Sequence, residues 1–235
     1  MTRRLYVSDV HLTPGDDQRL AAFTRLLQAA QEHVDEIYIL GDLCEMWIGD
    51  DDDSALTLSL TDLFRELRRS TKLGFVAGNR DFLLGEAFER RTGLKRYPDP
   101  HKLEDGTLLA HGDSLCTDDK DYQQMRALLR SSEWQKDILS KTLDERRAFG
   151  QALREQSMAA NANKAGNIMD VNATAVAELI HDQCPGFDRG QAKAPGPDLD
   201  RESVPPARPL FIHGHTHRPA IHALPGGGTR LVLGS

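Results

Sequence analysis

The sequence predicts an α/β fold of layered sheets and helices. Short apolar runs alternate with stretches whose apolar residues recur at helical spacing. Such alternation builds sheets whose parallel strands are joined by right-handed crossovers. Polar clusters follow five of the apolar runs, at the strand ends where open α/β sheets place their sites. The five expected strands are Leu5–Val7, Ile37–Leu40, Gly74–Ala77, Leu108–Ala110 and Leu210–Ile212.

The remaining elements are expected in chain order. Apolar spacing predicts helices over 18–32 and 57–69. The stretch 121–182 lacks proline and is mostly helical by pattern, so we expect a cap inserted into the single domain 1–235. The stretch 185–209 holds six prolines and is predicted to be a mobile loop. A last strand is expected at Arg230–Leu233.

Composition limits the class of protein. A chain of 235 residues with 39% hydrophobic and 28% charged residues fits one globular domain, without a membrane-spanning segment. The net charge of −7 argues against a protein that binds nucleic acid by neutralising phosphates. It permits a phosphate substrate, because bound divalent cations reverse the local charge. No obligate protein partner is evident.

The compartment follows from the cysteines and the start of the chain. Cys44, Cys116 and Cys184 are odd in number and far apart, which favours a reducing cytoplasm. Asp9 comes before the apolar region of a signal peptide would be complete. Acidic residues are densest at Gly49–Asp53, and we expect a solvated surface there rather than metal ligands.

Several polar clusters offer metal ligands. Asp9 and His11 are two residues apart, so both side chains point to the same side of an extended segment. His215 and His217 repeat this spacing. Asp42 is well placed to bridge two ions with its two oxygens, and a mixture of His and Asp suits Mn²⁺, Fe²⁺ or Zn²⁺ better than Ca²⁺ or Mg²⁺.

Each member of these clusters, taken alone, also fits an ordinary structural role. Asp9 and Asp42 would serve as helix caps, Asn79 as a turn residue, and His111 as a hydrogen-bonded core histidine. Asn79 would otherwise add a neutral oxygen ligand. Taken together, the clusters favour a metal centre. His213 is expected beside this centre or in the core, and four histidines have no supporting context: His33, His101, His181 and His222.

The clusters resemble the five motifs of the calcineurin-like metallophosphoesterases, in the same order and across nearly the whole chain. They are Asp9-Val10-His11, Gly41-Asp42, Gly78-Asn79-Arg80-Asp81, His111-Gly112-Asp113 and Gly214-His215-Thr216-His217. The resemblance implies an αββα sandwich of two mixed sheets. It also implies two metal sites that share Asp42: Asp9, His11, Asp42 and His217 hold one ion, and Asp42, Asn79, His111 and His215 hold the other.

The third motif departs from the superfamily pattern. Most members have a histidine, commonly assigned as the leaving-group acid, where this chain has Arg80. Arginine stays charged and cannot donate that proton, but it clamps phosphate oxygens well. A departing phosphate needs no proton, since its second pKa is about 6. Arg80 therefore favours a phosphoanhydride substrate, and the alternative is a surface arginine in a turn.

A finer resemblance is to the UDP-2,3-diacylglucosamine hydrolases of the lipid A pathway, carried by residues 41–51, 78–85, 111–119, 168–172 and 213–219. It implies hydrolysis of the pyrophosphate of UDP-2,3-diacylglucosamine to UMP and 2,3-diacylglucosamine 1-phosphate (lipid X), usually with two Mn²⁺ ions per chain. The implied catalytic residues are Asp42, Asn79, Arg80 and His111. The implied substrate contacts are Asn79, Arg80, Asp119, Ser157, Asn161, Lys164 and His215.

The predicted cap has features that suit an acylated substrate. Ser157, Asn161 and Lys164 are spaced i, i+4 and i+7 and share one helix face, although a solvated face has the same spacing. Small apolar residues between them leave room for acyl chains. Three aromatic residues are expected either to line a groove for the acyl chains or to pack in the core: Trp47, Phe82 and Tyr122.

Acyl chains in the substrate also predict a membrane surface as partner. A diacylated substrate resides in a bilayer, so we expect a peripheral enzyme at the cytoplasmic face of the inner membrane. Basic residues near the cap would add roughly 1 kcal/mol each at an anionic surface, giving salt-sensitive association. These residues are Lys141, Arg146, Arg147 and Arg154.

Two other functions stay open at this point. One is a metallophosphoesterase with another substrate, such as a soluble dinucleoside polyphosphate or a phosphoprotein. The other is a scaffold of the same fold without catalysis, although such proteins lack some of the metal ligands. Two features depart from the finer resemblance: 185–209 is longer than expected, and the chain ends at Gly234-Ser235, where relatives usually continue along a strand.

Overall fold

The computed structural model describes residues 2–162, 170–184, 209–224 and 227–234. Every apolar run expected to be a strand is one, with bounds within two residues of those expected, whereas the helix Glu86–Thr92 and the strands Leu94–Tyr97, His101–Lys102 and Ala220–Ala223 were not predicted. The elements are β1 (Arg4–Val7), α1 (Asp17–Ala30), β2 (Glu36–Leu40), α2 (Ala55–Leu67), β3 (Lys72–Val76), α3 (Glu86–Thr92), β4 (Leu94–Tyr97), β5 (His101–Lys102), β6 (Leu108–Ala110), the 3₁₀ turn η1 (Asp113–Leu115), α4 (Lys120–Leu129), α5 (Ser132–Leu139), α6 (Leu143–Ala162), α7 (Ala173–Gln183), β7 (Leu210–His213), β8 (Ala220–Ala223) and β9 (Thr229–Val232).

The strands form two sheets. The first has the order β1-β2-β3-β4, and all its pairs are parallel. The second has the order β5-β6-β7-β9-β8, with parallel pairs in its middle and antiparallel strands at both edges. Among the described strands, therefore, only the second sheet is mixed. Because β1, β2 and β3 run parallel in the first sheet and β6 and β7 run parallel in the second, the residues that follow them leave the sheets at carboxyl edges.

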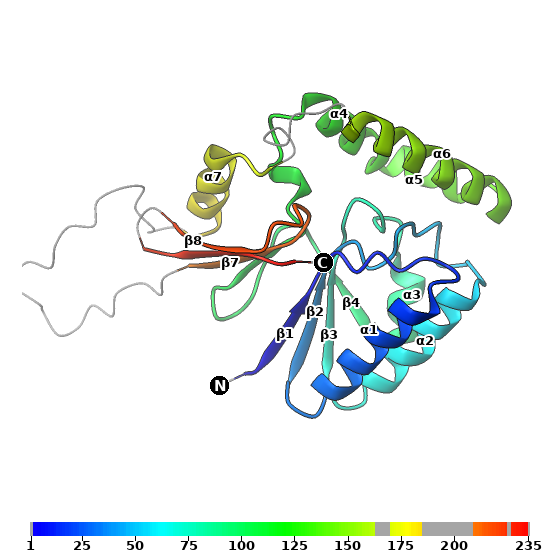
Figure 1. The fold of residues 1–235 in the computed structure, drawn as a ribbon, viewed down its shortest axis with the longest axis horizontal. Coiled ribbons are helices and arrows are strands. Elements are labelled where there is room, and N and C mark those ends of the chain that lie inside the picture. The colour runs from blue at the N-terminus through cyan, green and yellow to red at the C-terminus, as the bar shows by residue number, and fades with distance from the viewer. Residues whose placement is uncertain (1, 163–169, 185–208, 225–226, 235) are drawn as a thin grey trace, which may run out of the picture.

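Alternating side chains on the strands build an αββα sandwich (Figure 1). On β2, Ile37 and Ile39 pack toward the helices, while Tyr38 and Leu40 pack between the two sheets. In the second sheet, Phe211 packs with the side chains of α7. One layer of helices thus covers the first sheet, α7 covers the second, and a shared core lies between the sheets.

The predicted cap divides into two parts. Helices α4, α5 and α6 lie together above the carboxyl edge of the first sheet (Figure 1). Leu129 and Ile138 from these helices join the core of the first layer. Helix α7, also within 121–182, instead buries Val176 and Ile180 against the second sheet. The predicted loop 185–209 lies outside the described residues except for Pro209.

The acidic run at 49–53 is not simply a solvated surface. Asp50 accepts hydrogen bonds from the backbone N–H groups of Gly85 and Phe88, both at 2.8 Å, and so caps α3. Asp52 accepts from the hydroxyl group of Thr57 at 2.8 Å in the first turn of α2. The prediction was wrong for these two residues because Asp50 caps α3 and Asp52 accepts from hydroxyl groups at the start of α2. Asp53 is exposed, as expected.

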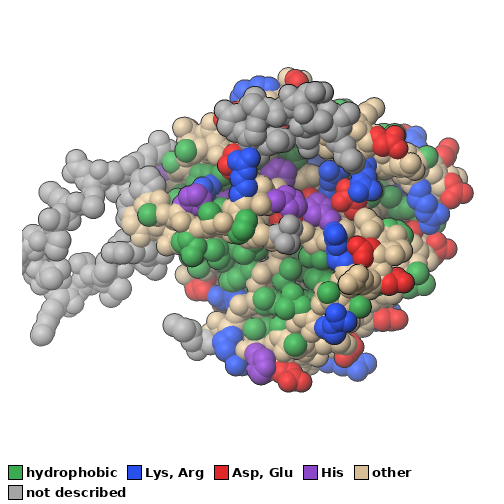
Figure 2. Space-filling view, in the orientation of Figure 1, with side chains coloured by type: hydrophobic (Ala, Val, Ile, Leu, Met, Phe, Trp, Pro, Cys, Tyr) green, Lys and Arg blue, Asp and Glu red, His purple; other side chains and the backbone are tan. Residues whose placement is uncertain are grey.

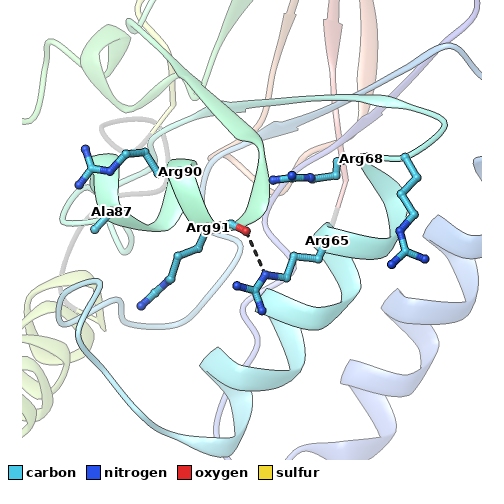
Figure 3. A pocket seen from close by; sticks show the side chains of 6 residues that line it. Arg65, Arg68, Ala87, Arg90 and Arg91 are labelled. Atoms are coloured by element: carbon cyan, nitrogen blue, oxygen red, sulfur yellow. Dashed lines mark hydrogen bonds between the residues drawn. The ribbon is translucent and has the colours of Figure 1, made fainter.

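An open groove of about 740 Å³ lies between α2 and α3 (Figure 3). Arg65 Nε donates to the carbonyl oxygen of Arg91 at 3.1 Å, and Arg90 pairs with Glu86 at 3.3 Å. Basic side chains in the last turn of a helix interact favourably with the negative end of its dipole. We therefore attribute this cluster to the two helix ends. The groove is lined by Arg65, Arg68, Arg69, Ala87, Arg90 and Arg91.

Across the described ranges, no helix combines the length and the apolar character needed to cross a membrane. The longest of them, α6, spans 20 residues and carries charged side chains along its length.

Candidate metal centre

The polar clusters meet where the strands end. Asp9 follows β1, Asp42 follows β2, Asn79 follows β3, and His111 follows β6. Asp9, Asp42 and His111 are buried almost completely. Histidine side chains gather in the middle of one face of the molecule, beside acidic and basic side chains (Figure 2). Five segments distant in sequence thus supply one cluster of nitrogen and oxygen atoms.

An uncommon backbone conformation aims many of these side chains. Aspartate and histidine adopt left-handed φ values more readily than most residues other than glycine. Here the backbone turns sharply at the strand ends, and hydrogen bonds between the loops hold it: Asp9 N–H donates to Gly41 O at 3.0 Å, and His11 N–H donates to Asp42 O at 2.9 Å. The residues with positive φ are Asp9 (55°), His11 (51°), Asp42 (52°), His215 (70°) and His217 (53°).

Two glycines allow the loops to come close together. A Cβ atom at Gly78 would lie 2.1 Å from Asp42 Oδ1, and one at Gly214 would lie 2.3 Å from Asp9 Oδ2. The backbone N–H of His215 donates to Asp9 Oδ2 at 2.9 Å. Any side chain at these glycines would displace a carboxylate of the cluster.

The first half-site comprises Asp9, His11 and His217. Their ligand atoms all lie within 4.8 Å of one another. The two imidazole Nε2 atoms are 3.3 Å apart, and His217 Nε2 is 3.7 Å from Asp9 Oδ1. Asp9 Oδ1 is buried and has no hydrogen-bond partner among the described residues. A buried anionic oxygen of this kind requires a cation or a donor.

The second expected half-site contains Asn79, His111 and His215, and the ligand atoms of Asp9, Asp42 and His111 lie within 4.8 Å of one another beside it. His111 Nδ1 lies 2.9 Å from the carbonyl oxygen of Leu40, which can only accept, so Nδ1 carries a proton. Nε2 is then the nitrogen left for a metal ion, and it faces Asn79, whose Oδ1 atom is 3.0 Å away. His215 packs edge-on against His111, with ring centres 4.9 Å apart. The backbone contact at Nδ1 thus orients His111 for ligation through Nε2.

Asp42 lies between the two half-sites. Its Oδ2 atom is 3.8 Å from His11 Nε2, and its Oδ1 atom is 3.7 Å from His111 Nε2. Each oxygen therefore faces one half-site. Oδ1 also accepts a hydrogen bond from the backbone N–H of Arg80 at 2.9 Å, which fixes the orientation of the carboxylate.

The electrostatics of the cluster fit divalent cations. Burial raises the pKa of Asp42, against the opposing effect of the histidines. Burial lowers the pKa of His215 to about 3. For His111, burial opposes protonation, but Asp42 and other nearby carboxylates outweigh it and raise the pKa to about 9. Carboxylates and imidazoles crowded at one buried point suit a pair of divalent cations, because two ions neutralise the charge and take the lone pairs.

Comparison with known proteins agrees with this geometry. Residues 2–219 match the family model for calcineurin-like phosphoesterases. A UDP-2,3-diacylglucosamine hydrolase from Aromatoleum aromaticum is 42% identical over 222 residues, covering 93% of this chain and 81% of that protein. One from Stenotrophomonas maltophilia is 42% identical over 237 residues, covering 98% and 89%. The chain belongs to the UDP-2,3-diacylglucosamine hydrolase family of calcineurin-like phosphoesterases. It is therefore a metal-dependent hydrolase.

Arg80 lies between the metal centre and the cap. Its Nη2 atom is 3.5 Å from Ser157 Oγ on α6. Its Nε atom is buried and has no hydrogen-bond partner among the described residues. Arg80 is therefore not an exposed turn residue, and its guanidinium group keeps donors available for an anion.

Two pockets meet at Arg80. The first, of about 260 Å³, contains His11, Asp42 and His215 of the metal centre, together with Asp119. The second, of about 280 Å³, has four apolar side chains in its wall (Phe82, Met125, Leu129 and Leu153) and is also lined by Asp121, Arg126, Arg130 and Gln156. Both pockets share Asn79, Arg80, Tyr122 and Ser157.

Not every predicted site residue can be placed. Asp119 caps α4 by accepting from the N–H of Tyr122 at 3.1 Å, at the edge of the first pocket. Asn161 belongs to α6, but its side chain and the whole of Lys164 lie outside the part of the chain that the structure describes. Trp47 packs edge-on against Phe88 in the core rather than lining a groove.

Sequence reasoning missed several residues around the site. Asp81 accepts from the backbone N–H groups of Leu43 and Gly78, so it ties two loops together. Asp113 accepts from Tyr122 Oη and Arg126 Nε, both at 2.7 Å, and so anchors α4. Both stand inside the quoted motifs, and their position beside the ligands was the available signal. His213 is buried next to the site, where burial lowers its pKa to about 4.

The predicted basic cluster of the cap is largely neutralised. Arg146 is buried and forms an ion pair with Asp51, while Arg147 pairs with Asp52 at 2.9 Å. These side chains join α6 to the acidic loop after β2. Arg146 is therefore too buried to face an anionic membrane, whereas Arg147 stays exposed and its contact with a membrane stays a prediction.

Proposed function

We propose that this chain hydrolyses the pyrophosphate bond of UDP-2,3-diacylglucosamine to UMP and 2,3-diacylglucosamine 1-phosphate, with two Mn²⁺ ions. The observation that carries the proposal is the junction of a metal-ligand pocket and an apolar pocket at Arg80. A substrate with phosphates at one end and acyl chains at the other matches that pair. The names of the relatives support the same substrate.

The metal ligands divide the work as follows. Asp9, His11, Asp42 and His217 would hold the first ion, and Asp42, Asn79, His111 and His215 would hold the second. Divalent cations at such sites lower the pKa of water and neutralise phosphate oxygens. Asp42 sets the separation of the sites, because each of its oxygens faces one histidine Nε2 atom.

Arg80 binds the diphosphate and stabilises negative charge as the bond breaks. Its guanidinium group has donors free for phosphate oxygens, beside the ligand Asn79. It cannot act as the leaving-group acid, and the departing phosphate needs none. Ser157, 3.5 Å from Arg80, holds it against α6 and offers a hydroxyl group to the sugar or phosphate.

The apolar pocket receives an acyl chain. Each buried methylene contributes about 0.8 kcal/mol, so acyl chains dominate affinity once they enter it. The cap also carries exposed apolar side chains that suit a bilayer surface: Met125, Leu128, Leu139 and Phe149. We propose peripheral association with the inner membrane through these residues rather than through the paired arginines.

One assay tests the activity. Protein and Mn²⁺ are incubated with UDP-2,3-diacylglucosamine, and UMP is detected, in parallel with UDP-glucosamine. We expect kcat/KM to be orders of magnitude higher for the acylated substrate. Equal values would refute acyl recognition, and no UMP from either would refute the proposed activity.

Two further measurements test the ion and the membrane. Metal analysis after loading with Mn²⁺ should give two bound Mn²⁺ per chain, and this protein should release UMP faster than protein loaded with Mg²⁺ or Zn²⁺. Flotation with vesicles should show binding that persists at high salt and weakens in the double variant Leu128→Ser/Phe149→Ser. Binding that salt abolishes would point to charge instead.

A further inference from the structure

Glu45 connects the first half-site to the cap. Its Oε2 atom lies 3.0 Å from His11 Nδ1, and its Oε1 atom lies 3.0 Å from Arg154 Nε on α6. The backbone N–H of Glu45 donates to the carbonyl oxygen of Leu12 at 2.9 Å, which holds the loop after β2 against the loop after β1. One mostly buried carboxylate thus joins a metal-ligand histidine to a helix of the cap.

The contact between Glu45 and His11 determines which nitrogen of the His11 imidazole is left for a metal ion. The Glu45 side chain is 16% exposed and lies between the imidazole of His11 and the guanidinium group of Arg154. A carboxylate only accepts, so its oxygen at 3.0 Å favours the tautomer of His11 that carries the proton on Nδ1. Nε2 is then left to face Asp9 and His217. Carboxylates behind a histidine orient metal ligands in this way in other proteins.

The cap meets the core along one helix. Arg146 at the start of α6 pairs with Asp51, Arg154 reaches Glu45, and Ser157 lies against Arg80. The side chain of Arg154 is 47% exposed, so its ion pair contributes little to the free energy of unfolding. Arg154 instead contacts Glu45 on the side away from His11, where it links α6 to the first half-site.

We propose that Glu45 is a positioning residue that holds His11 ready for the first metal ion, and that Arg154 makes this depend on the docking of α6. Seating of the cap and filling of the first half-site then favour each other. The proposal rests on the proposed function, because it concerns the same metal centre. It concerns the binding of the ion and not the hydrolytic step.

The first experiment measures Mn²⁺ binding by calorimetry, without substrate, in the full chain. Glu45→Ala should lower the affinity of one of the two sites by roughly 10- to 100-fold and leave the other unchanged, as removal of such partners does elsewhere. Glu45→Gln should recover part of the loss, because its amide oxygen still accepts from Nδ1–H. Glu155→Ala is the matched control, since Glu155 is exposed on α6 beside Arg154. Unchanged affinity in Glu45→Ala would overturn the proposal, even if its Tm fell.

The second experiment tests the link to the cap. Arg154→Ala should weaken the same half-site several-fold, and Arg154→Lys should restore most of the affinity. Arg147→Ala serves as the control, because Arg147 is on the same helix as Arg154 but pairs with Asp52 in the loop after β2. If Arg154→Ala binds both ions as the parent does, the coupling through α6 is wrong.

The proposed activity and the positioning role of Glu45 are tested by separate measurements. Metal binding is measured in the absence of substrate, so a parent protein that releases no UMP refutes the proposed function and leaves the role of Glu45 to be decided by calorimetry. Conversely, a parent that turns over the substrate while Glu45→Ala keeps both affinities refutes the positioning role alone.

Discussion

The two halves of the metal centre differ in their access to solvent. In the first half-site, 43% of the His217 side chain and 17% of the His11 side chain are exposed. In the second half-site His111 is fully buried. Its neighbour Asp113 receives hydrogen bonds from Tyr122 and Arg126 of α4. Asp9 of the first half-site is buried as well, and Asn79 and His215 of the second are partly exposed, so the half with His217 is the more open of the two. We therefore expect the ion of the open half to exchange faster.

Asp42→Ala should erase the difference between the halves. Asp42 faces both, so its loss should remove metal from each and abolish turnover. Metal content by mass spectrometry and UMP release are the two measurements, and Asp62→Ala, an exposed residue on α2, is the control. Activity near that of the parent would reject a dinuclear centre bridged by Asp42.

His217→Ala and His111→Ala should separate the halves. Each is expected to leave one Mn²⁺ per chain. His111→Ala should also lower the free energy of unfolding by about 2 kcal/mol, because it removes a buried, hydrogen-bonded ring. His217→Ala should leave stability nearly unchanged, since its side chain is partly exposed. Thermal unfolding of the metal-free variants checks this, and equal losses of Tm would contradict the division.

Arg80→Ala should change neither half. Both ions should bind as in the parent. The variant should lose about 2–4 kcal/mol of transition-state stabilisation, so kcat/KM should fall roughly 30- to 1000-fold. Metal titration and steady-state kinetics provide the readouts. A collapse of metal occupancy would make Arg80 structural and remove the main support for a phosphoanhydride substrate.

The metal-free protein should respond to pH in both directions. The pKa of His111 is raised to about 9, so its contribution to stability is complete below about 6.5 and is lost as pH rises toward 9. The pKa of His215 is lowered to about 3, so stability is lost as pH falls below about 6.5 toward 3. Tm measured in a chelator should therefore fall on both sides of about pH 6.5. In His215→Gln the acid side should become shallower, and an unchanged profile would refute this assignment.

The sequence predicted the strands and the ligands better than it predicted their surroundings. Asp9, Asp42, Asn79 and His111 could be found because each follows a buried apolar run, and parallel strands bring such ends together. The short elements were missed because α3 has seven residues and β5 has two, too few to establish a period.

The charged contacts of the cap could not be predicted from local pattern. Arg146 and Asp51 are 95 positions apart, and Arg154 and Glu45 are 109 apart. A pattern of charges three or four residues apart therefore cannot predict either ion pair. The acidic run at 49–53 and the basic residues of α6 therefore both resembled a solvent-exposed surface in the sequence. The placement of α7 on the second sheet likewise depends on Val176 and Ile180 meeting Phe211, which is a tertiary contact.

The left-handed backbone at the ligands sets a limit on engineering for thermal tolerance. Holding a residue other than glycine at such φ values costs about 1 kcal/mol or more. Asp9, His11, Asp42, His215 and His217 all adopt them. Glycine would relax the chain at each of these positions and would remove a ligand every time. Selection for heat resistance alone would therefore drift toward a hardier and inactive protein, and any such screen needs activity as a second criterion.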